Sequence, residues 1–189
     1  MNNRKAILFS APSGSGKTTI IKHLSEHYSC FEFSISATSR KPREGENDGV
    51  DYYFISHEEF KKKVENDEFL EWEEVYNGIC YGTLKTEIER IWEKGNIIVF
   101  DVDVNGGKRI KKYFGEDVLS IFVMPPSIEV LEERLRKRGT ETDEAIAQRL
   151  ERSAKELKEA SLFDKTIIND DLETAIATAI GVIDEYLEN

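Results

Sequence analysis

The stretch Phe9-Ser10-Ala11-Pro12-Ser13-Gly14-Ser15-Gly16-Lys17-Thr18-Thr19 decides the fold of this 189-residue chain. It follows an apolar run over residues 6–9, which predicts a strand, and precedes a segment with the apolar spacing of a helix. A strand, a glycine-rich loop and a helix in this order are typical of a phosphate-binding loop, in which backbone N–H groups and the helix N-terminus surround an anion. In such a loop Lys17 reaches the β- and γ-phosphates of a nucleotide, and the Thr18 hydroxyl coordinates Mg²⁺. The residues expected to contact the nucleotide are Ala11, Pro12, Ser13, Gly14, Ser15, Gly16, Lys17, Thr18 and Thr19.

The loop departs from the pattern G-x-x-x-x-G-K-[ST] at one position, because Ala11 stands where the first glycine belongs. A methyl group is the smallest side chain that could be added, and it is tolerated where φ is negative. An ordinary Ser/Gly turn is the alternative interpretation. The flanking strand and helix favour the nucleotide site over that turn.

Composition narrows the class of protein. The length favours one core with an inserted or appended subdomain. A net charge of −11 argues against a nucleic-acid partner, since phosphate backbones are bound by basic surfaces. No apolar run approaches the roughly 20 residues of a membrane span. Cys30 and Cys80 form no close-spaced pair and fit a reducing compartment. We expect a cytoplasmic protein without membrane or nucleic-acid partners.

A short histidine motif lies in the helix that follows the loop. His23-Leu24-Ser25-Glu26-His27 matches the H-x-x-E-H pattern of one group of zinc peptidases. The helix already belongs to the phosphate-binding loop, and the remaining histidine, His57, lies far along the chain. We interpret the two motif histidines as exposed residues of an ordinary helix.

The rest of the chain alternates between strand and helix patterns. Strands are expected at 31–35, 69–76, 79–83, 96–100, 118–123 and 165–168, with the turn Asn77-Gly78 joining the second and third. Helices are expected at 57–64 and at 84–93. A further helix is expected to end near residue 111, and others are expected to begin near residue 127, after Thr142 and after Asp171. The nearly all-apolar run at 96–100 is typical of a parallel strand buried on both faces. The pattern predicts an α/β fold whose parallel sheet carries the phosphate-binding loop.

A series of motifs gives the chain a specific resemblance. Residues 36–54 contain Ser36-x-Thr38-x-Arg40-x-Pro42-Arg43-x-Gly45-Glu46 and then Gly49-x-Asp51-Tyr52-x-Phe54. The series continues with Glu68-Phe69-Leu70-Glu71-Trp72, Tyr81-Gly82-Thr83, Asp101-Val102-Asp103, Arg138-Gly139-Thr140-Glu141-Thr142 and Ile168-Asn169-Asp170-Asp171. In this order it resembles the guanylate kinases, a family of P-loop nucleoside monophosphate kinases, over nearly the whole chain. The resemblance implies transfer of the γ-phosphoryl group of ATP to GMP with Mg²⁺ as cofactor, and dGMP is a further candidate acceptor.

The resemblance also assigns the acceptor site. It implies that the guanine is held by Ser36, Glu71, Thr83 and Asp103, and the GMP phosphate by Arg40, Arg43, Tyr52 and Tyr81. A carboxylate suits guanine because the N1–H and 2-amino groups are two parallel donors, and paired guanidinium groups suit a phosphate. Two positions depart from the family: Cys80 precedes Tyr81 where a tyrosine is frequent, and Asn105 replaces a common glutamine. We interpret Cys80 as a packing residue.

The remaining assignments concern the metal ion, the charge of the transferred group and the division of the chain. Asp101, at the end of a buried strand, is expected to support Mg²⁺ through water. The resemblance matches Arg134, Arg138 and Arg149 to lid arginines. It implies that Lys17, Arg40, Arg134 and Arg149 are catalytic, that Arg138 contacts ATP, and that Asn169 lies near the adenine. The expected division is a core at 1–35, 86–137 and 156–189, a GMP-binding arm at 36–85 and a lid at 138–155.

Two other classes stay open at this point. A related phosphoribosyl kinase would share the loop and the lid, but it would have no use for Glu71 and the tyrosines. A non-catalytic interaction module could have the same fold, although the intact Gly16-Lys17-Thr18 and the lid arginines argue against it. The sequence favours neither a monomer nor a homodimer.

Overall fold

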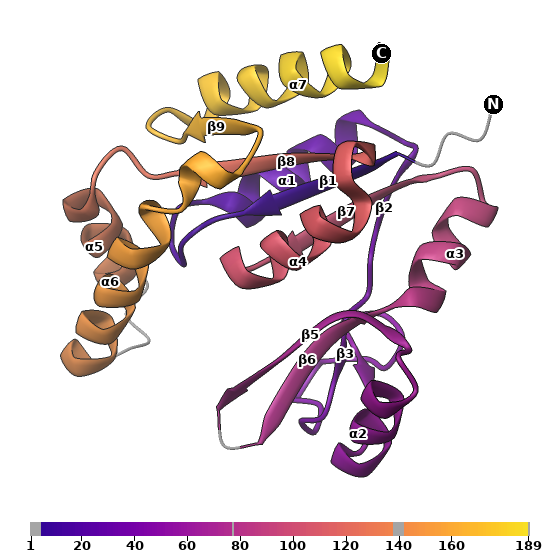
Figure 1. Ribbon diagram of the computed structural model, residues 1–189. Coiled ribbons are helices and arrows are strands. Elements are labelled where there is room, and N and C mark those ends of the chain that lie inside the picture. Colours follow the sequence, from indigo (N-terminus) through magenta and orange to yellow (C-terminus); the bar gives the residue numbers. More distant parts are fainter. Residues whose placement is uncertain (1–4, 77, 138–141, 189) are drawn as a thin grey trace.

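The computed structural model describes residues 5–76, 78–137 and 142–188. Its strands form a five-stranded sheet in the order β2-β7-β1-β8-β9 and a four-stranded sheet in the order β4-β3-β6-β5 (Figure 1). The strands are β1 (Ala6–Ser10), β2 (Phe31–Phe33), β3 (Ala37–Thr38), β4 (Tyr53–Phe54), β5 (Phe69–Tyr76), β6 (Ile79–Leu84), β7 (Ile97–Val102), β8 (Val118–Met124) and β9 (Lys165–Ile168). The α-helices are α1 (Lys17–His27), α2 (His57–Glu65), α3 (Lys85–Glu93), α4 (Val104–Phe114), α5 (Ile128–Lys137), α6 (Asp143–Leu157) and α7 (Leu172–Glu188).

All strand pairs of the larger sheet are parallel. Phe9 of β1 lies beside Asp101 of β7 on one side and Ile121 of β8 on the other. The carboxyl ends of β1 and β7 therefore meet at the same edge, where open α/β sheets bind their ligands. The predicted α/β class is confirmed, as are most predicted elements. Several bounds differ by one to three residues: β2 ends at Phe33 instead of Ile35, β7 continues through Asp101 to Val102, and α4 continues to Phe114. The short strands β3 and β4 were not predicted.

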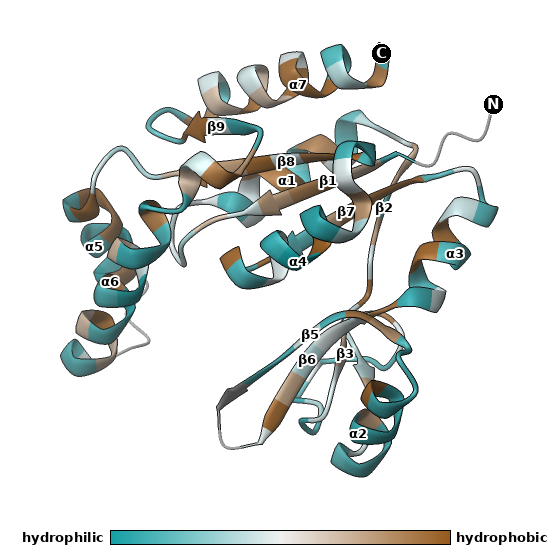
Figure 2. Cartoon of the chain, in the orientation of Figure 1, coloured by the Kyte–Doolittle hydropathy of each residue, from teal (hydrophilic) through white to brown (hydrophobic). Residues whose placement is uncertain are grey.

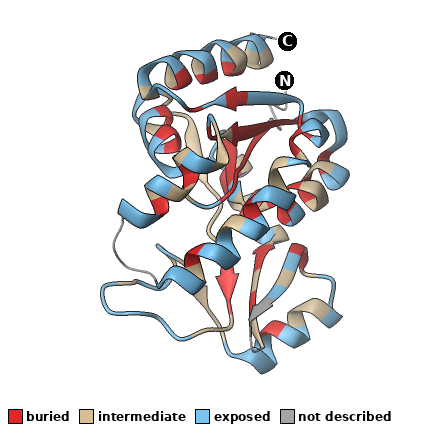
Figure 3. Cartoon of the chain, turned by 90° about the vertical axis from the view of Figure 1, so that its left-hand side faces the viewer, coloured by how far each residue is buried: buried red, intermediate tan, exposed pale blue. Residues whose placement is uncertain are grey.

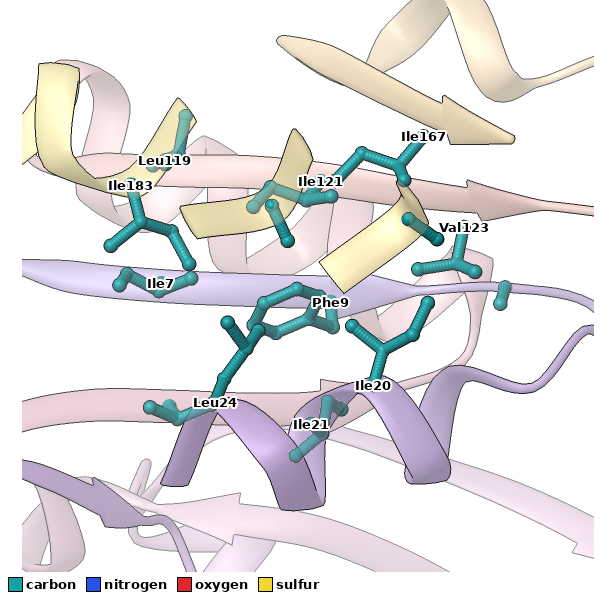
Figure 4. Packing of buried hydrophobic residues seen from close by; sticks show 14 of the residues in the cluster. Ile7, Phe9, Ile20, Ile21, Leu24, Leu119, Ile121, Val123, Ile167 and Ile183 are labelled. Carbon is teal, nitrogen blue, oxygen red and sulfur yellow. The ribbon is translucent and has the colours of Figure 1, made fainter. Parts of the chain in front are cut away.

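Strand β1 is buried on both faces because its side chains alternate between two hydrophobic clusters. Ile7 and Phe9 pack with residues of α1 and α7, as Figure 4 shows, whereas Ala6 and Leu8 pack against α3 and α4. Figure 1 shows α7 and α4 on opposite sides of the sheet. In Figure 3 the buried residues gather on the central strands. This packing anchors the phosphate-binding loop, which leaves the end of β1.

The smaller sheet has a hydrophobic cluster of its own. Strands β5 and β6 form an antiparallel hairpin that places Glu71 opposite Thr83, and α2 packs against the sheet through Phe60. The side chain of Ser56 caps α2 by accepting a hydrogen bond from the Glu59 N–H, as the sequence predicts. Cys80 is buried in this cluster, in agreement with a packing role. Figure 2 shows α2 with a largely hydrophilic outer surface.

Helices α5 and α6 lie side by side next to the phosphate-binding loop (Figure 1). Leu131 and Leu135 of α5 pack with Ile146 of α6, and the same two leucines lie about 3 Å from the position that a Cβ atom on Gly14 would take. The helix pair is thus packed against the loop itself. Among the described residues, no helix is long and apolar enough to cross a membrane.

Candidate active site

The phosphate-binding loop has the backbone conformation that its sequence requires. Gly14 and Gly16 have φ values of 93° and 90°, which are strained for any residue with a side chain. A Cβ atom on Gly16 would also collide with the side-chain amide of Asn169. Ala11 does not share this conformation, because Asp67 is the only non-glycine residue with positive φ in the described part of the chain. The alanine methyl group is accommodated in the cluster around Phe9.

A cavity of about 500 Å³ lies over this loop. Lys17 extends into it from the first turn of α1, where its ammonium group contacts Asp101 Oδ1 and lies 3.1 Å from the Val102 carbonyl oxygen. Thr18 and Asp101 both line the cavity and offer hard oxygen donors. The described residues contain no group of three acidic, histidine or cysteine side chains that could hold a metal ion. The two oxygen donors of Thr18 and Asp101 fit Mg²⁺, which binds through one or two protein oxygens together with substrate phosphates.

A second cavity of about 200 Å³ adjoins the first. It is lined by five of the residues predicted for the acceptor, namely Ser36, Tyr52, Glu71, Tyr81 and Asp103. Residues 101–103, at the end of β7, line both cavities. The structure therefore brings the predicted donor and acceptor sites together at the carboxyl edge of the parallel sheet.

Glu71 is the most buried carboxylate of the acceptor cavity, with 8% of the residue exposed. Its Oε1 atom accepts a hydrogen bond of 3.0 Å from the hydroxyl of Thr83, the residue opposite it in the hairpin. Burial raises the pKa of Glu71, and the negative charge of Asp103 adds to this effect. The Thr83 hydrogen bond and the positive charge of Arg109 act in the opposite direction and lower the pKa of Glu71. The carboxylate thus sits between opposing electrostatic influences.

Asp103 caps helix α4. Its Oδ1 atom accepts a hydrogen bond of 2.8 Å from the Gly106 N–H, and its Oδ2 atom lies 2.8 Å from Arg152 on α6. Capping explains how one of the two carboxylates after the buried strand is stabilised. The predicted contact of Asp103 with the guanine stays a prediction.

Arg40 lies at the centre of the predicted phosphate site. Its guanidinium group holds both carboxylate oxygens of Glu46 at 2.6 and 2.7 Å, donates to the Tyr81 hydroxyl at 3.1 Å, and lies 4.9 Å from the centre of the Tyr52 ring. The Arg40 hydrogen bonds, with one from the Arg43 backbone N–H, lower the pKa of Glu46 to about 2. Glu46 thereby fixes Arg40 beside the two tyrosines. The Arg43 side chain is exposed, and its predicted contact with the phosphate stays a prediction.

The arginines predicted for the lid occupy different places. Arg134 donates to the carbonyl oxygens of Asn169 and Ser15, at 2.9 and 3.3 Å, and lines a third cavity together with Asn169. Lys17 lines the first cavity and not this one, and Arg134 lines this one and not the first. Arg149 lines the first cavity and donates to Ser13 Oγ at 3.0 Å. Arg138 lies outside the described residues. The predicted catalytic roles of Arg134 and Arg149 stay predictions.

The structure adds three charged residues that no motif indicated. Glu87, with a side chain only 2% exposed, accepts hydrogen bonds from the Ile35 N–H and the Tyr53 hydroxyl and pairs with Arg90. Arg109 approaches Glu71, and Arg152 binds Asp103. Only the Glu87–Arg90 pair had a signal in the sequence, because it lies at i,i+3 in a helix. The other contacts join elements that are distant in the chain.

The zinc interpretation finds no support in the structure. His23 and His27 are both exposed on α1, as predicted. Among the described residues, no group of three histidine, cysteine, aspartate or glutamate side chains that could hold a metal ion lies around them. The helix serves the phosphate-binding loop at its N-terminus and the core at Ile20, Ile21 and Leu24.

Comparisons with known proteins agree with this geometry. A family model described as guanylate kinase matches residues 3–186. The chain is 55% identical over 183 residues to a guanylate kinase of Bacteroides fragilis, covering 97% of this chain and 90% of the relative. It is 49% identical to a guanylate kinase of Porphyromonas gingivalis, covering 97% and 98%. A crystal structure of guanylate kinase from Anaplasma phagocytophilum superimposes with a TM-score of 0.73 and 29% identity, covering 98% and 87%. The chain therefore belongs to the guanylate kinase family.

Proposed function

We propose that the protein transfers the γ-phosphoryl group of ATP to GMP, giving ADP and GDP, with Mg²⁺ as cofactor. The observation that carries the proposal is the meeting of two cavities at residues 101–103, one over the phosphate-binding loop and one around Glu71. Two substrates bound in adjoining cavities can bring a donor and an acceptor phosphate into line. Proximity of this kind accounts for much of the rate of phosphoryl transfer.

On the donor side, the loop binds the ATP phosphates through its backbone N–H groups and through Lys17. Thr18 and Asp101 would hold Mg²⁺, which prefers oxygen donors of this kind. When bound, Mg²⁺ supplies positive charge that neutralises the β- and γ-phosphates. Asn169, which lines the third cavity together with Gly16, lies near the adenine, and Arg138 contacts ATP.

On the acceptor side, the ionised carboxylate of Glu71 accepts hydrogen bonds from guanine N1–H and the 2-amino group. Ser36, Thr83 and Asp103 complete the guanine site. The GMP phosphate binds Arg40, Arg43, Tyr52 and Tyr81. Because Glu46 and Tyr81 already hold Arg40, little side-chain entropy is lost when the phosphate arrives.

The reaction needs charge neutralisation more than proton transfer. Lys17, Arg40, Arg134 and Arg149 spread the negative charge that develops on the transferred group, and no general base is required. In this proposal residues 36–85 form a GMP-binding arm and residues 138–155 a lid on the core. Their closure excludes water, which would otherwise accept the phosphoryl group. We further propose that the protein works in the cytoplasm.

The test is ADP formation from Mg·ATP with GMP, dGMP, AMP, CMP, UMP or a phosphoribosyl substrate as acceptor. The expected result is strong activity with GMP and no activity with AMP, CMP, UMP or the phosphoribosyl substrate. Chelation of Mg²⁺ should abolish it. Turnover of ribose phosphates instead of GMP would establish the phosphoribosyl kinase, and ATP binding without any turnover would establish the interaction module.

A further inference from the structure

Helix α4, which packs on the larger sheet, also contacts strand β5 of the smaller sheet and brings Arg109 close to Glu71. Arg109 Nη2 lies 2.9 Å from Glu73 Oε2 and 3.7 Å from Glu71 Oε2. Glu71 and Glu73 are two residues apart in a strand, so both carboxylates project from the same face. Arg109 Nε is buried and has no hydrogen-bond partner among the described residues. The guanidinium group is thus held at this edge chiefly by the two carboxylates.

The charges around Glu71 are unbalanced without this arginine. The polar and charged groups that line its cavity are Ser36, Tyr52, Glu73, Tyr81, Asp101 and Asp103, and Thr83 donates to it directly. Three of these groups are acids, and burial and Asp103 both raise the pKa of Glu71. Arg109 is the cation whose charge lowers that pKa. Asp103 is itself paired with Arg152, which reduces but does not remove its repulsion.

The charge of Glu71 decides which base it can bind. An ionised carboxylate has two acceptor oxygens, which match the two donors on the N1–H and 2-amino edge of guanine. A protonated carboxyl group has one donor and one acceptor, which match N1 and the 6-amino group of adenine. Protonation of Glu71 would therefore weaken GMP binding and relieve the discrimination against AMP.

We propose that Arg109 is a positioning residue that keeps the Glu71 carboxylate ionised and fixed in the acceptor cavity, and so sets the preference for guanine over adenine. The inference rests on the proposed function. Arg109 acts through Glu71 and does not touch the base. Its distance to Glu71 and the 41% exposure of its side chain describe a solvent-screened ion pair.

An ordinary ion pair with Glu73 is the alternative interpretation of the same contact. Such a pair would contribute to stability and would not alter the pH at which GMP is bound. The two interpretations are separated by comparing three variants: Arg109→Gln, Arg109→Lys and Lys112→Gln. Lys112 is an exposed residue of the same helix, so its replacement removes the same charge away from the cavity.

The experiment measures kcat/KM for GMP and for AMP between pH 5 and pH 8 at saturating Mg·ATP. In Arg109→Gln the loss of GMP activity on acidification should begin at higher pH, which lowers kcat/KM for GMP about two- to fivefold in the acidic range. The ratio of GMP to AMP activity should fall with it. Arg109→Lys keeps the charge and should follow the natural chain more closely, and Lys112→Gln should be indistinguishable from it.

A second readout does not depend on turnover. The carboxyl carbon of Glu71, assigned with Glu71→Gln, can be titrated by NMR in the natural chain and in Arg109→Gln. A higher midpoint in Arg109→Gln supports the inference. Equal midpoints, or equal pH profiles for Arg109→Gln and Lys112→Gln, would overturn it. Absence of GMP turnover by the natural chain would instead overturn the proposed function, while the NMR titration would still decide the Arg109 contact.

Discussion

Replacement of Glu71 by glutamine tests the proposed contact between this carboxylate and the guanine base. The side chains have nearly the same shape, but glutamine carries no charge and has one donor in place of an acceptor. Because the Thr83 hydroxyl donates to Oε1 at 3.0 Å, the amide oxygen should take that position. The amide NH₂ group would then take the position of Oε2, on the side of Arg109. There it would face the donors of guanine with a donor of its own.

The expected loss follows from one charged hydrogen bond. Such a bond contributes about 1.5–3 kcal/mol, which corresponds to a fall of roughly 10- to 150-fold in kcat/KM for GMP. Activity with AMP should not fall in parallel, since adenine presents one donor and one acceptor. A coupled assay of ADP formation at pH 7, with GMP and AMP varied separately at saturating Mg·ATP, measures both.

The control is Glu89→Gln, which makes the same chemical change at an exposed position of α3. It should leave both activities as they are. Thermal unfolding of both variants separates a loss of stability from a loss of recognition, because Glu71 is buried. A loss of GMP activity within about threefold would be smaller than the contribution of a single charged hydrogen bond. If Glu71→Gln is folded and shows only such a small loss, the proposed role of Glu71 is wrong.

Three further predictions concern the loop, the buried acid and the contact with α6. Gly16→Ala places a side chain at φ 90° against the Asn169 amide, so stability should fall by about 1 kcal/mol or more and ATP affinity should fall with it; unchanged affinity by calorimetry would contradict this. Glu87→Ala removes the acceptor of the Ile35 N–H and of the Tyr53 hydroxyl and leaves Arg90 paired with Glu32 alone, so urea unfolding should show a loss of about 1–3 kcal/mol. Burial opposes ionisation of Glu87, but its hydrogen bonds lower its pKa below the usual value. The stabilisation by Glu87 is therefore present above the unfolded pKa of about 4.3 and is lost on acidification below it. If the natural chain and the variant lost stability equally on acidification, this account of Glu87 would be refuted. Arg152→Ala should raise KM for GMP more than KM for ATP, because Arg152 holds Asp103; equal changes in steady-state kinetics would count against it.

The linear order of residues determined much of the fold and of the site. Local signals are carried by residues that are neighbours in the chain, such as the loop glycines, Ser56 at the start of α2, and the hairpin from Phe69 to Leu84. The clustering of Arg40 with Tyr52 and Tyr81 followed from the family's motifs, and the structure brings these three side chains together. The negative φ of Ala11 was the condition that the loop needed, and it is met.

Other features depend on which elements pack together in space. Arg109 reaches Glu71 only because α4 packs on β5, and Arg152 reaches Asp103 only because α6 lies beside the end of β7. Arg109 and Glu71 are 38 positions apart in the chain, and Arg152 and Asp103 are 49 positions apart. No periodicity or motif indicates such a contact, since an arginine that faces only water and one that pairs with an acid far along the chain can have the same local sequence pattern. The sequence by itself determined the phosphate-binding loop and the family, whereas tertiary packing decided which charges surround Glu71, because electrostatic interactions depend on distance in space and on burial.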